Sequence, residues 1–357
     1  MGGGEGNISR IMLCEKRQLG KTGLSLPPIL FGTSCLGNLY QEISHATKLQ
    51  IAREWFANVA APVALDSAGK YGAGLALEEI GRVLSELDIA GDQVVISNKL
   101  GWKRVPLKGP EPTFEPGAWV GIGHDAEQHI NAQGIVECWR QGCELLGGRY
   151  RPQLVSVHDP DEYLLAASGP ADRDRRFGQV VEATAALRKL KADGEVKAVG
   201  VGAKDWKVIR DLAGAVELDW VMFACSLTLY THPPELLAFI EDLSRRGVGV
   251  INSAVFNAGF LTGGQYFDYR KPDPAAEPEL FRWRERFLAL CGRHRVSSNL
   301  ACVQFGLSAP AVAAVALNTS RPERIADNVE LVAGRVGGEF WADMKAQGLI
   351  DKDYPYL

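Results

Sequence analysis

The sequence lacks the features that mark membrane, secreted and nucleic-acid-binding proteins. Its 357 residues carry a formal net charge of only −4, and no run of 18 apolar residues occurs. Neither a polyanionic partner nor a membrane-spanning helix is therefore expected. The first residues also lack the basic segment and apolar run of a secretory signal. We expect a cytoplasmic protein that binds neither nucleic acid nor membranes.

Cysteine usage gives no sign of a disulfide or metal framework. The chain has seven cysteines, an odd number, and no Cys-x-x-Cys pair or zinc-type spacing occurs among them. This pattern is typical of reduced thiols in a reducing compartment. It predicts no metal site.

The signature of an open, doubly wound α/β sheet is missing from any usable position. That fold places a G-x-G-x-x-G/A loop between a strand and a helix. Residues 121–126 match the letters, but no strand precedes them. No Tyr-x-x-x-Lys pair occurs either, which removes the usual acid pair of the short-chain dehydrogenases. A different α/β architecture is therefore expected.

What the chain does have is a regular alternation of apolar runs and helical patterns. Hydrophobic residues make up 46% of the sequence, which is enough for a full core. The runs predict strands at 29–31, 63–66, 93–99, 153–158, 196–201, 220–224, 248–253 and 312–317. Helical patterns follow at 46–59, 75–87, 130–146, 177–192, 206–213, 234–246, 278–294 and 322–333, with further helical runs near Leu300 and at 338–347.

Eight strand–helix units in one chain predict an α/β fold, a closed (β/α)8 TIM barrel. A hairpin with a Gly-containing turn is expected at 16–28, ahead of the first strand. We expect a flexible tail over 1–15 and a single barrel domain over 16–357. Long loops are predicted after strands three, four and seven, at 101–129, 159–176 and 257–277, and all three would rim the same mouth.

Ionisable side chains stand at the ends of three consecutive predicted strands. Asp66 ends one strand and Tyr71 follows it five residues later, Lys99 ends the next, and His158 ends the third. Taken singly, each has an ordinary structural explanation, such as a loop cap, a rim aromatic, a surface lysine or a turn residue. Because the carboxyl ends of parallel barrel strands converge, we expect the four groups to share one site.

These four groups can together move a proton. A free tyrosine has a pKa of about 10, and an ammonium such as that of Lys99 would lower it. Asp66 would hold Lys99 charged and in place, and His158 would orient a substrate oxygen. This is half of a carbonyl–alcohol interconversion. No side chain supplies the other half, hydride, so a nicotinamide cofactor is implied.

The motif Asp66-x-Ala68-x-x-Tyr71-Gly72, together with Lys99 and His158 after the next two strands, resembles the catalytic tetrad of the aldo-keto reductases. The segments at 19–25 and 31–33 also resemble that family's N-terminal hairpin and first strand. The resemblance implies that Tyr71 is the general acid/base, that Lys99 lowers its pKa, that Asp66 pairs with Lys99, and that His158 orients the carbonyl or hydroxyl.

The same resemblance suggests cofactor contacts. The positions it implies are Gly32, Thr33, Ser226, Ser253, Ser320, Arg324 and Asn328. The family's Ser-Asn pair after strand five is replaced by Ala203-Lys204, and Ser226 stands nearest to its usual Gln. NAD or NADP is implied, with NAD favoured because Asn318 stands where a basic residue for a 2′-phosphate is expected.

Within the family, residues 157–163 and the Asp66-Ser67-Ala68 variant resemble the sugar 1-dehydrogenase branch, which includes the D-threo-aldose, L-fucose and L-galactose dehydrogenases. This implies a small sugar or aldehyde as substrate. Trp102, Trp119 and His124 would stack on a sugar or bond to it, although simple loop packing explains the tryptophans equally well. A pyridoxal dehydrogenase or a general aldehyde/ketone reductase is the alternative. Nothing in the sequence predicts the oligomeric state.

Two functions of other classes remain open. A lysine at the end of a barrel strand, such as Lys99, suits a lyase that forms a Schiff base, but a partner Asp66 would keep the amine charged. A non-catalytic nucleotide-binding subunit could share the fold, and the intact tetrad argues against it.

Overall fold

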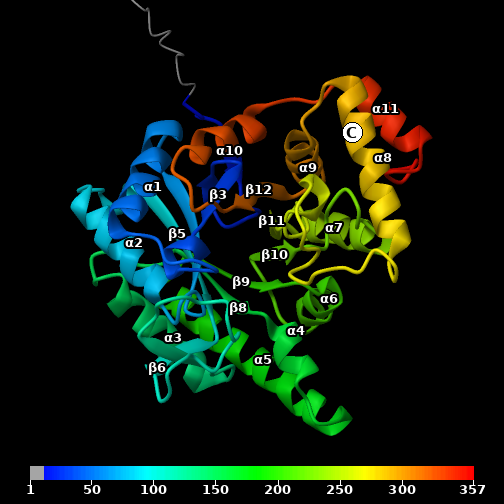
Figure 1. Ribbon diagram of the computed structural model, residues 1–357. Coiled ribbons are helices and arrows are strands. Elements are labelled where there is room, and N and C mark those ends of the chain that lie inside the picture. The colour runs from blue at the N-terminus through cyan, green and yellow to red at the C-terminus, as the bar shows by residue number, and fades with distance from the viewer. Residues whose placement is uncertain (1–11) are drawn as a thin grey trace, which may run out of the picture.

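The computed structural model describes residues 12–357, and its centre is a closed barrel of parallel strands (Figure 1). Each strand pairs with its neighbours in parallel, and the last closes on the first, with Val315 opposite Ile29. In barrel order the strands are β3 (Ile29–Gly32), β4 (Val63–Ala68), β5 (Val94–Leu100), β8 (Leu154–His158), β9 (Ala198–Ala203), β10 (Trp220–Ala224), β11 (Gly249–Ser253) and β12 (Val312–Leu317). The predicted (β/α)8 barrel is confirmed.

Helices surround the barrel and bury their apolar faces against it (Figure 1). Local signals set several of their ends: Ser44, Asn131 and Asp205 cap three helix N-termini by accepting backbone N–H groups. The helices are α1 (His45–Asn58), α2 (Leu75–Glu86), α3 (Ala132–Leu145), α4 (Pro160–Leu165), α5 (Pro170–Ala192), α6 (Trp206–Ala215), α7 (Pro234–Arg246), α8 (Pro278–His294), α9 (Ser298–Gly306), α10 (Arg324–Ala333) and α11 (Gly338–Ala346), with short 3₁₀ turns η1 (Ser34–Gly37), η2 (Gly91–Gln93) and η3 (Phe260–Thr262). None of the helices in residues 12–357 is long and apolar enough to span a membrane.

A hairpin of β1 (Arg17–Gln18) and β2 (Ser25–Leu26) closes the N-terminal end of the barrel, as predicted. Leu19 and Leu26 are fully buried in the cluster that fills this end of the interior. The hairpin turn is tied to the barrel by a hydrogen bond from Lys21 N to Gly247 O. A Cβ on Gly249 would lie 2.5 Å from a Leu19 methyl carbon, so only glycine permits this approach.

Two of the predicted long loops contain regular structure. The stretch 101–129 holds an antiparallel hairpin of β6 (Trp102–Pro106) and β7 (His124–Gln128). The stretch 159–176 holds α4 and the first turns of α5, which begins at Pro170 rather than at residue 177. Proline suits the first helical turn, and Asp172 accepts a hydrogen bond from Ser168 N. These two loops were therefore predicted wrongly as irregular, whereas the third, 257–277, holds only the short η3 turn.

The predicted tail, 1–15, lies largely outside the described residues. Leu13, the second residue that the structure describes, is buried and exchanges backbone hydrogen bonds with Asn58 and Ala60. The chain is therefore packed against the rest of the protein from Leu13, three residues before the predicted start of the domain. The single-domain organisation stays a prediction.

Candidate active site at the barrel mouth

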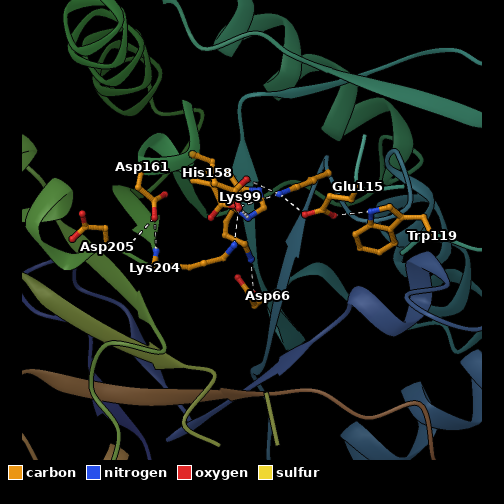
Figure 2. Close-up of polar contacts among 11 residues, drawn as sticks. Asp66, Lys99, Glu115, Trp119, His158, Asp161, Lys204 and Asp205 are labelled. Atoms are coloured by element: carbon orange, nitrogen blue, oxygen red, sulfur yellow. Dashed lines mark hydrogen bonds and ion pairs between the residues drawn. The ribbon is translucent and has the colours of Figure 1, made fainter. Parts of the chain in front are cut away.

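Alternate residues of each barrel strand point inward, and this alternation places three of the predicted site residues in one layer. On β4, β5 and β8 the inward positions near the carboxyl end are Asp66, Lys99 and His158, all buried. Strand register puts Ala68 beside Lys99, and His158 beside Gly202 of the next strand. A Cβ on Gly202 would lie 3.5 Å from Lys99 Cδ, so a larger side chain at this position would crowd the lysine. Figure 2 shows Asp66, Lys99 and His158 converging at the barrel mouth.

The structure brings all four predicted residues together. Lys99 Nζ lies 2.5 Å from Asp66 Oδ2 and 4.7 Å from the centre of the Tyr71 ring. The His158 ring meets the Tyr71 ring edge-on, with centroids 5.9 Å apart. The ammonium and the phenol are thus neighbours, as the proton-transfer hypothesis requires.

Glycines position the segment that carries Tyr71. Gly72 has a φ of +60°, and a Cβ there would lie 2.4 Å from Gly37 O. A Cβ on Gly37 would in turn lie 2.7 Å from the Tyr71 carbonyl carbon. On the other side, a Cβ on Gly69 would lie 2.5 Å from Trp102 O. The Tyr71 segment is therefore packed backbone-to-backbone between η1 and β6, which fixes the height of the phenol above the barrel.

The electrostatics of Tyr71 differ from the expectation. Burial raises the pKa of the Tyr71 hydroxyl well above its ordinary value, and the carboxylates of Asp66 and Asp159 raise it further. Lys70 is the neighbouring cation that opposes them. The direction is opposite to that predicted from Lys99, because burial and the neighbouring carboxylates outweigh the nearby cations. At neutral pH the phenol is held protonated.

His158 is neutral and partly without partners. Burial lowers the pKa of its imidazole well below the ordinary value, and the ammonium groups of Lys99 and Lys70 lower it further. Nδ1 is buried and has no hydrogen-bond partner among residues 12–357. Nε2 lies 3.5 Å from Asp159 Oδ2, beyond normal hydrogen-bond length. A neutral ring in this state can donate to a substrate oxygen.

Of the three predicted substrate-contacting residues, the structure places two beside the site. Trp119 lies 5.9 Å from Tyr71 between ring centroids, and Phe114 links Trp119 to Trp102 at 6.2 and 5.8 Å. This aromatic wall flanks the phenol. His124 is exposed and lies opposite Pro106, at the end of the β6–β7 hairpin away from Trp102. The prediction that His124 contacts substrate has no support in its position.

The predicted cofactor residues follow the carboxyl ends of the strands, and several are already engaged. Thr33 Oγ1 donates to Asp66 O at 2.9 Å, and Gly32 lies beside Asp66 in the sheet. Ser226 donates to Lys204 O and Ser253 to Phe223 O. Thr33 therefore braces the strand that carries Asp66, while both serines donate their hydroxyl protons to backbone carbonyls.

The segment before α10 offers the chemistry that a pyrophosphate needs. Ser320 receives a hydrogen bond from Gln41, and α10 begins at Arg324 rather than at residue 322 as predicted. Within residues 12–357, the guanidinium groups of Arg321 and Arg324 have no hydrogen-bond or ion-pair partner. Asn328 lies one turn further along α10. Free cations at a helix N-terminus fit the diphosphate of a nicotinamide dinucleotide.

Sequence reasoning missed a charge cluster centred on the buried Lys70, next to the tetrad. Lys70 Nζ forms ion pairs with Glu115 at 2.7 Å, Glu162 at 3.0 Å and Asp159 at 3.2 Å. Glu162 also pairs with Lys204 at 2.6 Å. The members of this cluster come from four separate segments of the chain. The only signal in the sequence is the high content of polar and charged residues at 158–163.

Sequence reasoning also missed three tyrosines whose side chains are at least half exposed: Tyr40, Tyr266 and Tyr269. Lys204 Nζ lies 5.5 Å from the centre of the Tyr269 ring. Burial is the main cause that raises the pKa of Tyr40, and the nearby carboxylate of Glu115 and the phenol of Tyr266 raise it further. These tyrosines come from loops distant in sequence, so no local pattern marks them.

The structure combines a parallel barrel with a tyrosine, a lysine, an aspartate and a histidine at its mouth. This combination is typical of one class of oxidoreductases, and comparison with known proteins identifies the family. The aldo/keto reductase family model matches residues 28–347. The chain therefore belongs to the aldo/keto reductase family. It is an oxidoreductase of a family that uses nicotinamide cofactors and acts on small-molecule aldehydes and sugars.

Characterised relatives align over nearly the whole chain. A pyridoxal 4-dehydrogenase from Microbacterium luteolum is 28% identical over 352 residues, covering 94% of this chain and 98% of that one. A D-threo-aldose 1-dehydrogenase from a Pseudomonas species is 27% identical over 345 residues, covering 92% and 96%. An L-galactose dehydrogenase from Arabidopsis thaliana is 23% identical, covering 89% and 88%.

Solved structures share the fold. An aldo-keto reductase from Bacillus halodurans in its holo form superposes with a TM-score of 0.67 at 21% identity, covering 94% of this chain and 96% of that one. A glycerol dehydrogenase from Gluconobacter oxydans gives the same TM-score at 17% identity, covering 95% and 96%.

Proposed function

We propose that this protein oxidises C1 of a free aldose to the lactone, with Tyr71 as the general acid/base. The observation that carries the proposal is the position of Lys99 Nζ, 2.5 Å from Asp66 Oδ2 and 4.7 Å from the Tyr71 ring centre. The names of the D-threo-aldose and L-galactose dehydrogenases among its relatives support an aldose as the substrate.

Each of the four side chains has one task in this reaction. Tyr71 Oη takes the proton of the C1 hydroxyl during oxidation and returns it during reduction. Lys99, held by Asp66, presents positive charge to the phenol face and stabilises the phenolate. Neutral His158 donates a hydrogen bond to the reacting oxygen and orients it. When bound, an oxidised nicotinamide would accept the hydride that leaves C1, which no side chain can do.

We propose NAD rather than NADP as the cofactor. Arg321 and Arg324, both unpaired within residues 12–357, would hold the diphosphate together with Ser320 at the start of α10. Asn318, whose amide donates to Ser34 Oγ at 2.9 Å, is a neutral residue at the position where a 2′-phosphate would need a cation. Comparing binding of NAD⁺ and NADP⁺ by fluorescence quenching tests this choice directly.

A second substrate, pyridoxal, is favoured by a specific feature. The rings of Tyr71, Trp119 and Phe114 pack in series beside the mouth, and a pyridine ring would extend such a series from Tyr71. The pyridoxal 4-dehydrogenase among the relatives supports this alternative. A Schiff-base lyase is not supported, because that chemistry needs a neutral amine and Lys99 lies against a carboxylate.

The deciding experiment follows the absorbance of reduced cofactor while free aldoses, simple aldehydes and pyridoxal are offered with NAD⁺ or NADP⁺. The proposal expects the highest kcat/KM for an aldose with NAD⁺. A preference for pyridoxal of more than about tenfold would transfer the proposal to the second substrate. Absence of turnover with every compound would remove the proposed reaction itself.

A further inference from the structure

Lys70 is the most buried member of the charge cluster beside the tetrad, and it directly precedes Tyr71. Its side chain is 4% exposed, yet it carries an ammonium. Burial alone would lower the pKa of Lys70, but the carboxylates of Asp159, Glu115 and Glu162 outweigh it and raise that pKa. Lys70 is therefore a fixed positive charge that joins three segments of the rim.

The three carboxylates around Lys70 are not equivalent. Glu162 keeps a second cation, Lys204, at 2.6 Å. Glu115 keeps the indole N–H of Trp119 at 2.8 Å (Figure 2). Asp159 has no second partner of this kind. Within residues 12–357 its carboxylate forms ion pairs with Lys70 and with the His158 ring. Removing the Lys70 charge would thus isolate one carboxylate beside the imidazole.

The geometry at Asp159 makes this neighbour consequential. A single oxygen, Oδ2, lies 3.2 Å from Lys70 Nζ and 3.5 Å from His158 Nε2. Asp159 adopts a left-handed backbone conformation, with φ +47°, and its N–H donates to Gly202 O at 2.9 Å. The carboxylate is therefore anchored next to the ring, and Lys70 holds its shared oxygen at ion-pair distance.

We propose that Lys70 is a positioning residue that keeps the Asp159 carboxylate from capturing His158 Nε2, so that the imidazole stays free for the substrate oxygen. The proposal rests on the role of His158 in the proposed function. Without Lys70, His158 is the basic side chain left within 4 Å of Asp159 Oδ2 among residues 12–357, and a carboxylate bonded to imidazole favours its protonated form.

Several other charged or titratable groups face the His158 ring, and none of them replaces Lys70. Lys99 and Lys204 also disfavour the imidazolium, whereas Glu162 favours it. The full set is Lys70 and Tyr71 from the β4–α2 connection, Lys99 from β5, Asp159 and Glu162 from the start of α4, and Lys204 after β9. Of these, only Lys70 also contacts Asp159 among the ion pairs of residues 12–357.

The test measures the His158 ring in the ligand-free protein by NMR of ¹⁵N-labelled histidines. The chain has six histidines, and loss of one signal in His158→Gln assigns the resonance. We expect the wild-type ring to stay neutral from about pH 5.5 to 8.5, and to titrate within that range in Lys70→Met. This readout does not depend on the substrate, so it decides the inference even if the proposed reaction fails.

Three further variants separate positioning from simple structural damage. Lys70→Arg keeps the charge, and Lys70→Met combined with Asp159→Asn removes the intruding carboxylate; both should restore the wild-type titration. Lys48→Met removes another buried lysine, paired with Glu79 on the outside of the barrel, and should change nothing at His158. Should Lys70→Met not accumulate as folded protein, Lys70→Gln is measured in its place.

Turnover gives the second readout. We expect kcat to fall about tenfold to a hundredfold in Lys70→Met, with KM changed less, and to recover largely in the double variant. Failure of Asp159→Asn to restore either the titration or kcat, in variants that remain folded by circular dichroism, would overturn the inference. An unchanged His158 titration in Lys70→Met would overturn it as well.

Discussion

At its N-terminal end the barrel interior is filled by Leu30, Val95, Leu154 and the fully buried Trp220. At the C-terminal end, four residues or about 13 Å farther along β5 and β8, the same interior holds charged side chains. The lower layer is apolar and sealed by the β1–β2 hairpin. The upper layer contains the buried ion pair of Lys99 with Asp66, and in the β4–α2 connection beside it the buried Lys70 pairs with three carboxylates.

The difference teaches how one set of strands serves two purposes. Apolar burial in the lower layer stabilises the fold in proportion to the area removed from water. Buried charges in the upper layer lose hydration energy, which their mutual attraction barely offsets. Alternation with a period of two keeps both layers inside the barrel, and on β5 and β8 the buried Ser97 and Ser156 lie between the structural layer and the functional layer.

The largest effect expected in the upper layer is that of Tyr71→Phe. Removing the phenolic hydroxyl deletes the proton carrier, so kcat should fall by roughly 10²–10⁴-fold while the free energy of unfolding and nucleotide binding change little. Stopped-flow hydride transfer and fluorescence titration measure the two properties. Tyr150→Phe, which removes a buried hydroxyl bonded to Ile89 O, is the matched control and should keep normal turnover. Near-normal kcat in Tyr71→Phe would show that another group carries the proton.

Trp220→Ala is the corresponding break in the lower layer. The indole is fully buried and packs over Gly200, where a Cβ would lie 2.6 Å from the indole ring. We expect a loss of about 3–5 kcal/mol in the free energy of unfolding, measured by urea denaturation. The kcat of the remaining folded fraction should stay close to that of the wild type. A loss of stability below about 1 kcal/mol would mean that the lower layer does not support the barrel as argued.

The pair Asp66–Lys99 sharpens the comparison, because both members are buried in the upper layer. Asp66→Leu or Lys99→Met alone leaves one buried charge unpaired and should cost about 3 kcal/mol of stability. The double variant should recover most of that loss and yet remain inactive. A double-mutant cycle of unfolding free energies, run beside turnover assays, measures both quantities. Additive losses in the double variant would contradict this account of the layer.

The pH dependence of the two reaction directions should differ. Because the pKa of Tyr71 is raised well above its ordinary value, the phenol is protonated at neutral pH. Reduction, which uses the acid form, should be nearly independent of pH around neutrality. Oxidation uses the phenolate, so its kcat/KM should rise with pH, by up to about tenfold per unit. A rate of oxidation that is flat from pH 6 to 9, at saturating and at low substrate, would contradict the assignment.

Much of this architecture could be predicted from local patterns. The strands at 220–224 and 312–317 and the helices at 234–246 and 278–294 have the predicted bounds, because their apolar runs end at clear signals such as Gly247, which adopts a left-handed conformation after α7. The tetrad was also predictable, since three consecutive strands each end in an ionisable residue.

What could not be predicted depends on contacts between distant segments. Strands β6 and β7 carry polar, half-buried residues with no alternation, and only their pairing with each other identifies them as strands. Lys70 finds Asp159 and Glu162 at separations of 89 and 92 residues. The raised pKa of Tyr71 likewise depends first on its burial in the folded chain and then on carboxylates that include the distant Asp159, whose proximity no sequence spacing reveals.

The closure of the barrel between β3 and β12 has a consequence for synthesis of the chain. Strand β3 contributes residues 29–32, but one of its two neighbours, β12, spans residues 312–317. At a ribosomal rate of about 5–20 residues per second, one edge of β3 waits on the order of 15–60 seconds for its partner. During that interval the nascent protein exposes an unpaired strand edge, the kind of surface that chaperones bind, and removing chaperones should lower the soluble yield.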